Sequence, residues 1–343
     1  MKKTIAILLT LMCLATSQAA LAAESDKGSF DIKETIFSHL GDHYGWEVPF
    51  STDKRIPLPV IVWSTTSGWH LFSSSRVTGG QTFEGFHIAK AGKYKNKIVE
   101  SVGGAEVRPL DLSITKNVAA LIISALVVVG IVFNMKHWYK KNRMKAPRKF
   151  TGCIETLVEF IYSSVIKPTL GDKAMRFAPY LLTVFFFIFT MNLLGLIVIF
   201  PGGANLTGNL AVTMVLAVAT FVITNVCGTK RYWKDILWPD VPLWLKFPIP
   251  LMPVIELFGI FTKPMSLMVR LFANMMAGHM IVLVLTSLMF FFVGYGIVAQ
   301  SGVAAVSVLF ELFMLTLDVL FSFIQAFVFT ILSTIFISLA VEK

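Results

Sequence analysis

Residues 263–281 have the sequence KPMSLMVRLFANMMAGHMI and lie inside an apolar stretch that runs from residue 253 to residue 292. A helix of that length would measure about 60 Å, whereas the hydrocarbon core of a bilayer is about 30 Å thick. We therefore expect this helix to be steeply tilted or bent within a membrane, and Pro264 offers one place for a bend. Arg270 stands in its middle, where a permanent charge costs from about 2.5 to more than 10 kcal/mol, so we expect Arg270 to have a function.

A second apolar stretch, residues 304–341, is almost as long as the first. The connection between them, VGYGIVAQSGV at residues 293–303, is short and carries no charge. Because neither end of the pair is polar, we expect both helices to lie within the bilayer. The two stretches should therefore form an antiparallel hairpin that turns at the outer face of the membrane.

The composition is that of a polytopic membrane protein. The mean hydropathy is +0.73, and 55% of the residues are hydrophobic against 15% charged. The formal net charge of +10 lies mostly in loops between apolar stretches, so membrane topology explains it better than a nucleic-acid partner does. We predict an all-α membrane fold with about five membrane helices, at residues 117–135, 178–200, 208–226, 253–292 and 304–341.

The charges of the loops predict which side of the membrane each loop occupies. The first helix ends in KHWYKKNRMKAPRK, whose basic residues place that loop in the cytosol. The next loop, PGGANLTGN at residues 201–209, carries no charge, and the loop after residue 226 is basic again. The N-terminal region should therefore lie outside and the C-terminus in the cytosol. Residues 151–166 alternate in polarity at the helical period and predict an amphipathic helix at the cytosolic interface.

The N-terminus has the pattern of a secretory signal. Two lysines precede a short apolar run and small residues that favour cleavage after residue 22. An uncleaved anchor helix is the alternative. Residues 23–116 are polar and contain short β-prone runs such as PLPVIVW and KIVESV between turn signals, so we expect a small exported region of strands and loops, followed by a membrane domain at 117–343.

Polar residues recur at regular spacing in both long helices. Glu256, Lys263 and Arg270 are seven apart and share one helical stripe, because each step of seven turns a helix by only about 20° beyond two full turns. Ser266 and Asn274 lie close to this stripe, whereas His279, nine residues from Arg270, points to the opposite face. Glu311, Asp318 and Gln325 form an equivalent stripe in the second helix. If the hairpin folds about residues 297 and 298, Arg270 lies opposite Gln325 and His279 lies level with Asp318.

Several of these residues also have simpler interpretations. Lys263 can reach the membrane interface with its long side chain, and Glu311 can lie near the outer surface. Asn192, Asn209 and Asn274 can serve as hydrogen-bonding groups between helices. His279 and Asp318 can form a buried ion pair that only fastens the two helices together.

The residue types favour a proton path. An arginine keeps its proton under all physiological conditions, so Arg270 acts as a fixed charge that lowers the pKa of a nearby carboxylate and repels a passing cation. Histidine and aspartate do exchange protons, so His279 and Asp318 suit a relay. The carboxylate that meets Arg270 need not belong to this chain.

The stretch KPMSLMVRLFANMMAGHMI, the later IQAFVFTILSTIFISLA and MNLLGLI in the second span together resemble subunit a of the rotary F-type ATP synthase, its membrane stator. The resemblance covers about residues 117–343. It implies that Arg270 faces the essential carboxylate of a c-subunit ring, between two offset half-channels, with Gln325 close to Arg270. It assigns His279 and Asp318 to the outer half-channel, where Glu311 would lie at the entrance, and implies a polar route lined or neighboured by Glu256, Ser266 and Asn274.

In one common bacterial pattern of this family, an acid stands where this chain has His279 and a histidine where it has Asp318. The exchange keeps one acid and one imidazole in the path. The resemblance further implies a bacterial inner-membrane location, and as partners the c ring, the b-subunit peripheral stalk and the remaining ATP synthase subunits.

The chain shows no phosphate-binding loop, nucleophile constellation or metal-ligand cluster, so we expect no catalysis by this chain alone and no cofactor. A secondary transporter that binds an anion through Arg270 is the alternative function, although the unlike halves show no internal repeat. An intramembrane enzyme would need a catalytic pair that the sequence does not offer.

Overall fold

The structure is a computed structural model that describes residues 41–47, 55–65, 67–78, 81–89, 94, 96–102, 105–142, 147, 149–197, 203–237, 251–291 and 297–342. The chain divides into two compact units. The first contains Met1–Ile123, Leu194–Ala204 and Met280–Leu315, and the second contains Ser124–Leu193, Asn205–His279 and Thr316–Lys343. The predicted signal peptide lies outside the described residues.

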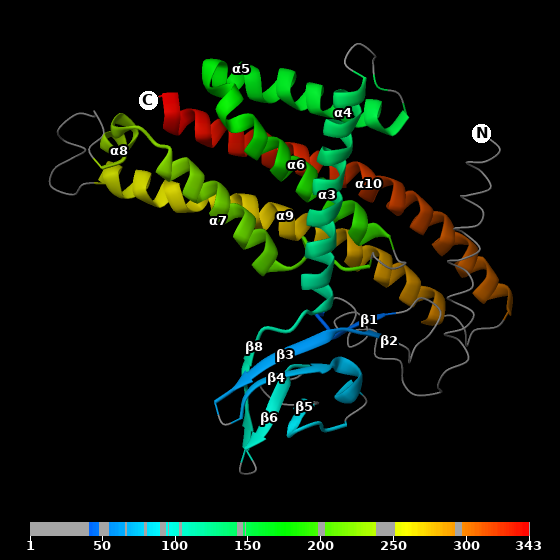
Figure 1. The fold of residues 1–343 in the computed structure, drawn as a ribbon. Coiled ribbons are helices and arrows are strands. Elements are labelled where there is room, and N and C mark those ends of the chain that lie inside the picture. Colours follow the sequence, from blue (N-terminus) through cyan, green and yellow to red (C-terminus); the bar gives the residue numbers. More distant parts are fainter. Residues whose placement is uncertain are drawn as a thin grey trace. The chain divides into compact units, whose positions relative to one another are not determined.

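The predicted strand region is present between residues 45 and 111 (Figure 1). Its strands are β1 (Gly45–Glu47), β2 (Arg55–Pro57), β3 (Pro59–Ser64), β4 (Gly68–Ser73), β5 (Phe86–Ile88), β6 (Ile98–Val102), β7 (Ala105–Val107) and β8 (Leu110–Asp111). The strands pair in the orders β1-β2, β4-β3-β8 and β5-β6-β7, and all the pairs are antiparallel. A short 3₁₀ turn, η1 (Ser74–Arg76), follows β4.

A small core joins the last two sheets. Val60, Val62 and Phe72 of β3 and β4 pack with Phe86 and Ile98 of β5 and β6, and all five are buried. This is the alternation expected of strands with one face in a core, because successive side chains point to opposite faces. Polar groups tie the same elements together. The Ser64 hydroxyl donates to the Glu100 carboxylate at 2.5 Å.

Tyr44 fastens the segment before β1 to this core. Its hydroxyl donates to the Asp111 carboxylate and accepts a bond from the Ile98 amide. Burial raises the pKa of the Tyr44 hydroxyl above its usual value, and the hydrogen bond to Asp111 raises it further. The neutral phenol is therefore the form that the fold stabilises.

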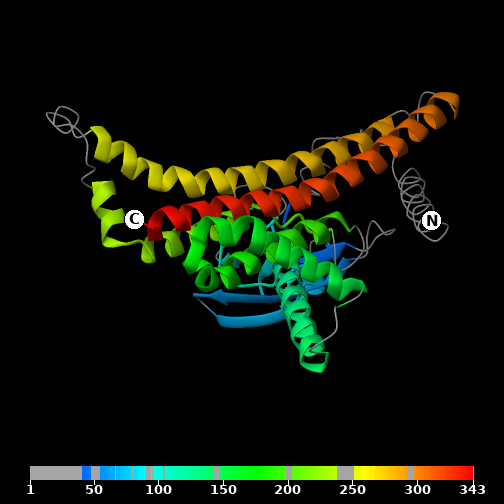
Figure 2. The ribbon, with the colours of Figure 1, turned by 90° about the horizontal axis from the view of Figure 1, so that it is seen from above.

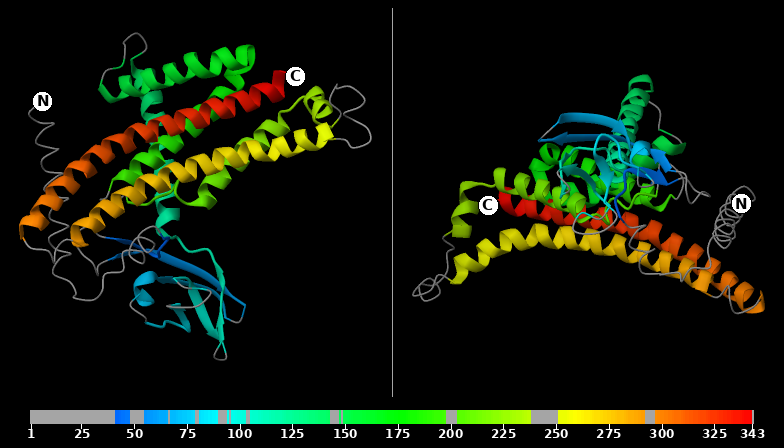
Figure 3. Two further views of the ribbon diagram at one scale, coloured as in Figure 1. Left: turned by 180° about the vertical axis from the view of Figure 1, so that it is seen from behind. Right: turned by 90° about the horizontal axis from the view of Figure 1, so that it is seen from below.

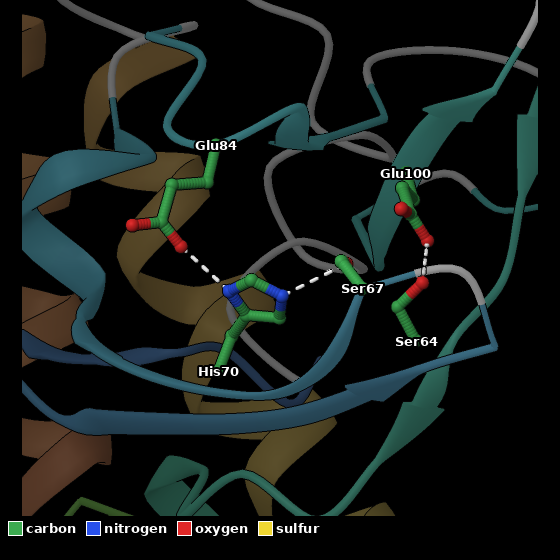
Figure 4. Close-up of polar contacts among 5 residues, drawn as sticks. All are labelled: Ser64, Ser67, His70, Glu84 and Glu100. Atoms are coloured by element: carbon green, nitrogen blue, oxygen red, sulfur yellow. Dashed lines mark hydrogen bonds and ion pairs between the residues drawn. The ribbon is translucent and has the colours of Figure 1, made fainter.

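A strained turn connects residues 83 and 86 of the strand region. Phe83 and Phe86 exchange two backbone hydrogen bonds of 2.9 Å, and the two residues between them, Glu84 and Gly85, have φ of 52° and 83°. Glutamate rarely adopts a positive φ. The Glu84 carboxylate lies 2.6 Å from Nδ1 of His70, whose Nε2 lies 2.8 Å from the Ser67 hydroxyl (Figure 4). This chain of contacts holds the turn against β4.

The strand region continues directly into α3 (Lys116–Lys141). The Lys116 amide donates to the His43 carbonyl at 2.9 Å, and the Asn117 amide donates to the Asp42 carboxylate at 3.2 Å. An acidic side chain at this place satisfies one of the unpaired amides of a helix start and complements the helix dipole. The first turn of α3 is thus anchored to the strand region. The helix is longer than the predicted 117–135 because its basic end remains helical.

The helices that follow α3 are interrupted by irregular turns. The predicted amphipathic segment 151–166 is α4 (Lys149–Ile161) with a π turn, η3 (Tyr162–Ile166), and α5 (Lys167–Leu170) follows. Gly171, with φ 53°, ends α5 and begins the 3₁₀ turn η4 (Gly171–Lys173). A positive φ stops a helix, and glycine adopts it without a steric penalty. The chain then continues as α6 (Ala174–Leu196), α7 (Leu210–Val226) and α8 (Lys230–Leu237).

The two long apolar stretches are both helices. They are α9 (Leu251–Phe291), which contains Pro264 without interruption, and α10 (Ile297–Glu342). Within the second unit, their residues 251–279 and 316–342 run side by side in all views (Figures 2 and 3). The connecting residues 292–296 lie outside the described part, so the hairpin turn remains a prediction.

Four helical segments among the described residues are long and apolar enough to cross a membrane, and they are Lys116–Lys141, Phe150–Leu196, Ile255–Val282 and Val306–Val341. A fifth span is obtained if two helices, Leu210–Val226 and Lys230–Ile236, are counted as one span that bends by 108°. The expectation of a mostly helical protein with several membrane helices is therefore confirmed.

The second unit is held together by α10, which packs against the preceding helices. Phe323 of α10 meets Phe185 and Phe189 of α6 edge to face at centroid distances of 5.9 and 6.0 Å. Its neighbour on the helix, Phe327, stacks on Phe160 of α4 at 5.6 Å. Small hydroxyl residues fill the rest of this buried face, and they are Ser322, Thr330, Ser333, Thr334 and Ser338. Small residues allow membrane helices to approach closely, which fits this packing.

Candidate functional site

Arg270 lies on a face of α9 that the described chain leaves uncovered. Arg270 itself is exposed. Its neighbour Val269 is exposed too, and so is Met265, one turn before Val269. Ser266 and Glu256 are exposed on the same helix. The opposite side of α9 is buried, with Leu267 and Leu271 among its members. Glu256 and Arg270 of the predicted polar stripe are thus presented outward, away from the packing of this unit, whereas Lys263 is only partly exposed.

The turn that carries His279 meets Asp318 of α10. The carboxylate lies so close to Gly278 that a Cβ built there would be 2.8 Å from Oδ1 of Asp318. His279 and Asp318 are both partly buried. Eighteen residues further along α10 than Asp318, at Phe336, the ammonium group of Lys263 lies 5.9 Å from the centre of the ring. These two contacts fix an antiparallel arrangement of the helix segments, and they place the turn of His279 level with Asp318.

A buried network supports the turn of α10 that carries Asp318. The Thr207 hydroxyl donates to Oδ1 of Asn192 at 2.7 Å, and Nδ2 of Asn192 donates to the Ser322 carbonyl at 3.4 Å. The Ser322 hydroxyl then donates to the Asp318 carbonyl at 2.7 Å. Thr207, Asn192 and Ser322 are fully buried or nearly so. The network joins α6 and the segment before α7 to the polar stripe of α10.

Asn192 therefore bonds between helices, as one of the simpler interpretations predicted. Asn209 does not: its side chain accepts from the Ala211 amide and caps α7. The interhelical interpretation was wrong for Asn209 because Asn competes well for the free amides of a helix start. Thr207 was missed by the sequence reasoning, since a threonine in an uncharged loop carries no signal of burial or of a distant partner.

Lys263 lines a pocket between α7, α8, α9 and α10. The polar members of the lining are Thr220, Thr224, Asn225, Tyr232 and Lys263. Lys263 is only partly exposed. Its head lies over Phe336, so it is directed at a neighbouring helix and contributes one of the polar groups in a mostly apolar pocket of this unit.

The remaining predicted residues are placed as follows. Gln325 is buried, seven residues after Asp318, and Asn274 is partly buried on α9. Glu311 is partly buried and belongs to the first unit. The residues brought together within the second unit are the turn of His279, Asp318 and the Asn192 network, while Arg270, Ser266 and Glu256 remain on the open face of α9.

Two family profiles match this chain. The profile of the family described as ATP synthase A chain matches residues 118–338. The profile of a domain of unknown function, DUF8433, matches residues 35–112, which contain the strand region.

Named relatives are about two fifths identical to this chain over the aligned residues. ATP synthase subunit a of Chloroherpeton thalassium is 40% identical over 242 residues, which are 69% of this chain and 69% of that protein. ATP synthase subunit a 2 of Chlorobaculum tepidum is 43% identical over 245 residues, 68% of this chain and 65% of that protein. ATP synthase subunit a of Myxococcus xanthus is 39% identical over 251 residues, 71% of this chain and 77% of that protein. The profile match, which includes the helices that carry Arg270 and Asp318, and these identities show that the chain belongs to the ATP synthase subunit a family.

Proposed function

We propose that this chain is the proton-translocating stator subunit of an F-type ATP synthase membrane sector. In this role Arg270 faces the carboxylate of a c-subunit ring, and two half-channels connect that meeting point to the two sides of the membrane. Proton flow through them is coupled to rotation and hence to ATP synthesis. The family membership supports the general role, and the residue assignments rest on the arguments below.

The observation that carries the proposal is the exposure of Arg270 on an apolar helix face. A guanidinium group facing hydrocarbon alone is very costly, so this face requires a partner that offers a compensating charge. A rotor carboxylate meets that requirement. Because Arg270 lowers the pKa of such a carboxylate, it also promotes release of the proton at this point.

The outer half-channel would use Glu311, Asp318 and His279. Asp318 and the turn of His279 lie together between α9 and α10, and the Asn192 network holds the backbone of Asp318. An acid and an imidazole on turns that meet suit proton transfer near neutral pH. Gln325, buried next along the stripe, and Asn274 would complete the route toward Arg270.

The cytosolic half-channel would use the other end of α9. The pocket beside Lys263 is lined by hydroxyl and amide groups that can bind water. Glu256 and Ser266 are exposed on the same end of α9. A proton released near Arg270 would leave along this side.

The cycle follows from the cost of charge in lipid. A rotor carboxylate protonated through the outer half-channel is neutral and can turn through hydrocarbon, whereas an ionised one cannot do so cheaply. When it returns to Arg270 it loses its proton to the cytosolic side. The direction reverses when ATP hydrolysis in the rest of the complex drives the rotor.

The topology and partners follow from the same role. We place the chain in a bacterial inner membrane with residues 23–116 outside and the C-terminus in the cytosol, as the loop charges predict. The c ring would cover the open face of α9, and the b-subunit peripheral stalk would hold the chain still. The chain itself would catalyse no reaction. The two half-channels are an arrangement that functions only with the rotor present.

Arg270→Ala in the assembled complex tests the proposal. ATP-driven proton pumping and passive proton leak are measured in membrane vesicles, with assembly checked in the same preparation. The expected result is loss of coupled pumping with leak retained or increased, because no fixed charge then separates the half-channels. Val269→Ala, at the adjacent exposed position, is the matched control and should pump normally. Normal pumping by Arg270→Ala would overturn the proposed mechanism.

A further inference from the structure

One face of the sheet β4-β3-β8 is largely apolar and mostly exposed, with Ser73 opposite Pro59 at one end as its polar member. Directly paired residues of antiparallel strands point to the same side. Trp63 pairs with Trp69 on one side and with Leu110 on the other, and Ile61 pairs with Leu71. The amide of Leu112 donates to the carbonyl of Ile61, which continues the ladder. We call these six residues, Ile61, Trp63, Trp69, Leu71, Leu110 and Leu112, the outer sheet face.

The outer sheet face is not part of the core of the exported region. The core lies on the opposite side of β3 and β4, where Val60, Val62 and Phe72 are buried. By contrast, 64% of Trp69, 74% of Leu71 and 55% of Leu112 are exposed. A contiguous apolar face of this kind marks an interaction surface in a soluble region.

The chain continues from the outer sheet face directly into a candidate membrane helix, which indicates that the face lies near the membrane. Leu112 is four residues before Lys116, where α3 begins, and α3 is a candidate membrane span. The bonds from the Lys116 and Asn117 amides to His43 and Asp42 anchor the helix start in the exported region. The face therefore begins beside the point at which the chain enters the bilayer.

The orientation of the face agrees with that position. In Figures 1 and 3 (left), β5 and β6 lie below β3 and β4, while the first turn of α3 lies above them. The core side of the sheet is thus turned away from the start of α3. The outer sheet face is on the side from which α3 leaves, which is the side of the membrane.

The residue types also fit a lipid surface. Tryptophan is enriched where proteins meet the headgroup region, because its ring is apolar and its N–H remains hydrogen-bonded there. Leucines beside tryptophans supply apolar area that the acyl boundary can cover. Arg108, exposed two residues before Leu110, adds a basic group next to the face.

We propose that the outer sheet face docks on the outer leaflet of the membrane, with Trp63 and Trp69 at the headgroup level. The strand region is then a membrane-surface module, and it fixes the angle at which α3 enters the bilayer. This inference rests on α3 crossing the membrane and not on the proton path, so its test is independent of the Arg270 experiment.

The test uses the whole ATP synthase in lipid nanodiscs. All three cysteines are replaced, and a single cysteine is introduced as Leu71→Cys or Trp69→Cys and labelled with an environment-sensitive fluorophore. The control is Glu106→Cys on β7, an exposed position of the other sheet. Two quenchers are compared, a nitroxide carried on the lipid headgroup and iodide in the water.

Labels on the outer sheet face should be quenched several-fold more by the lipid nitroxide than the control label, and several-fold less by iodide. Equal iodide quenching at Leu71→Cys, Trp69→Cys and Glu106→Cys would overturn the proposal, because the face would then be in water. Protection of the face from both quenchers would also overturn it, since the cover would then be protein. Two labelling positions guard against a local effect of either substitution.

Discussion

Gly278 of α9 lies directly against the carboxylate of Asp318 in α10, so closely that the position has no room for a side chain. A Cβ at Gly278 would lie 2.8 Å from Oδ1 and 3.4 Å from Cγ of Asp318. Real Cβ atoms do not approach an oxygen so closely, so any side chain there must displace the carboxylate. The absence of a side chain at Gly278 is thus a condition for the placement of Asp318 beside the turn of His279.

Gly278→Ala should therefore impair proton transfer while leaving the helix intact. Alanine is the better helix former, so the backbone is not weakened. The displaced carboxylate of Asp318 would lower the rate of ATP-driven proton pumping, by about tenfold if the loss is roughly 1.4 kcal/mol in the barrier. The rate is measured in membrane vesicles at equal levels of assembled complex.

Gly259→Ala is the matched control for that experiment. Gly259 lies on the same helix, and a Cβ there would meet nothing within 4 Å. Its pumping rate should equal that of the unmodified chain. Equal rates for Gly278→Ala and Gly259→Ala would show that the position of the Asp318 carboxylate is unimportant for proton flow.

Thr207→Val should destabilise the second unit. The substitution keeps the shape of the side chain and removes the donor to Asn192, leaving a buried acceptor without its 2.7 Å bond. Such a loss costs about 1–3 kcal/mol. Less subunit should remain assembled after heating of the detergent-solubilised complex. Thr183→Val, at an exposed threonine whose hydroxyl bonds only within its own helix, is the control, and a similar loss for both would contradict the role given to the network.

The long helices and their polar stripes could be predicted from the sequence because they depend on local periodicity. Spacings of seven between Glu311, Asp318 and Gln325 fix a shared helix face wherever the helix lies. The alignment of His279 with Asp318 could also be predicted, because a turn near residue 297 sets which residues of two antiparallel helices lie opposite one another. The structure places Gly278 against Asp318, which agrees with that register.

Contacts between residues that no period relates could not be predicted. Thr207 and Asn192 are fifteen residues apart on different segments, and the bonds of Asn192 depend on how α6 packs on α10. Likewise, the run PVIVW predicts a strand but gives no indication of which apolar residues are buried. Val62 is fully buried while its neighbour Trp63 is 39% exposed, and only the strand pairing reveals the outer sheet face.

Lys173→Met should loosen the C-terminal end of α10. The ammonium group of Lys173 donates to the Val341 carbonyl at 2.7 Å, one of the last carbonyls of the helix, which have no partner within it. A cation at the C-terminal end of a helix also interacts favourably with the negative end of the helix dipole. Because Lys173 is exposed, we expect a modest loss of about 1 kcal/mol, seen as faster hydrogen exchange in residues 335–342.

Lys167→Met is the control for the same measurement, since Lys167 is exposed one turn earlier in the same segment. Exchange in residues 335–342 should then be unchanged. If both variants accelerate exchange equally, the effect is due to lost surface charge and not to the bond with Val341.

Tyr44→Phe should change how the stability of the strand region depends on pH. The folded state raises the pKa of Tyr44 above its unfolded value of about 10. Its contribution is therefore fully present below about pH 10 and is lost as the pH rises through the folded pKa. A brief pulse of an alkaline-active protease on the assembled complex should cut Tyr44→Phe faster than the unmodified chain at pH 8, and the difference should shrink at pH 11. Tyr94→Phe is the control, and a difference that stays constant across this range would contradict the buried, neutral state of Tyr44.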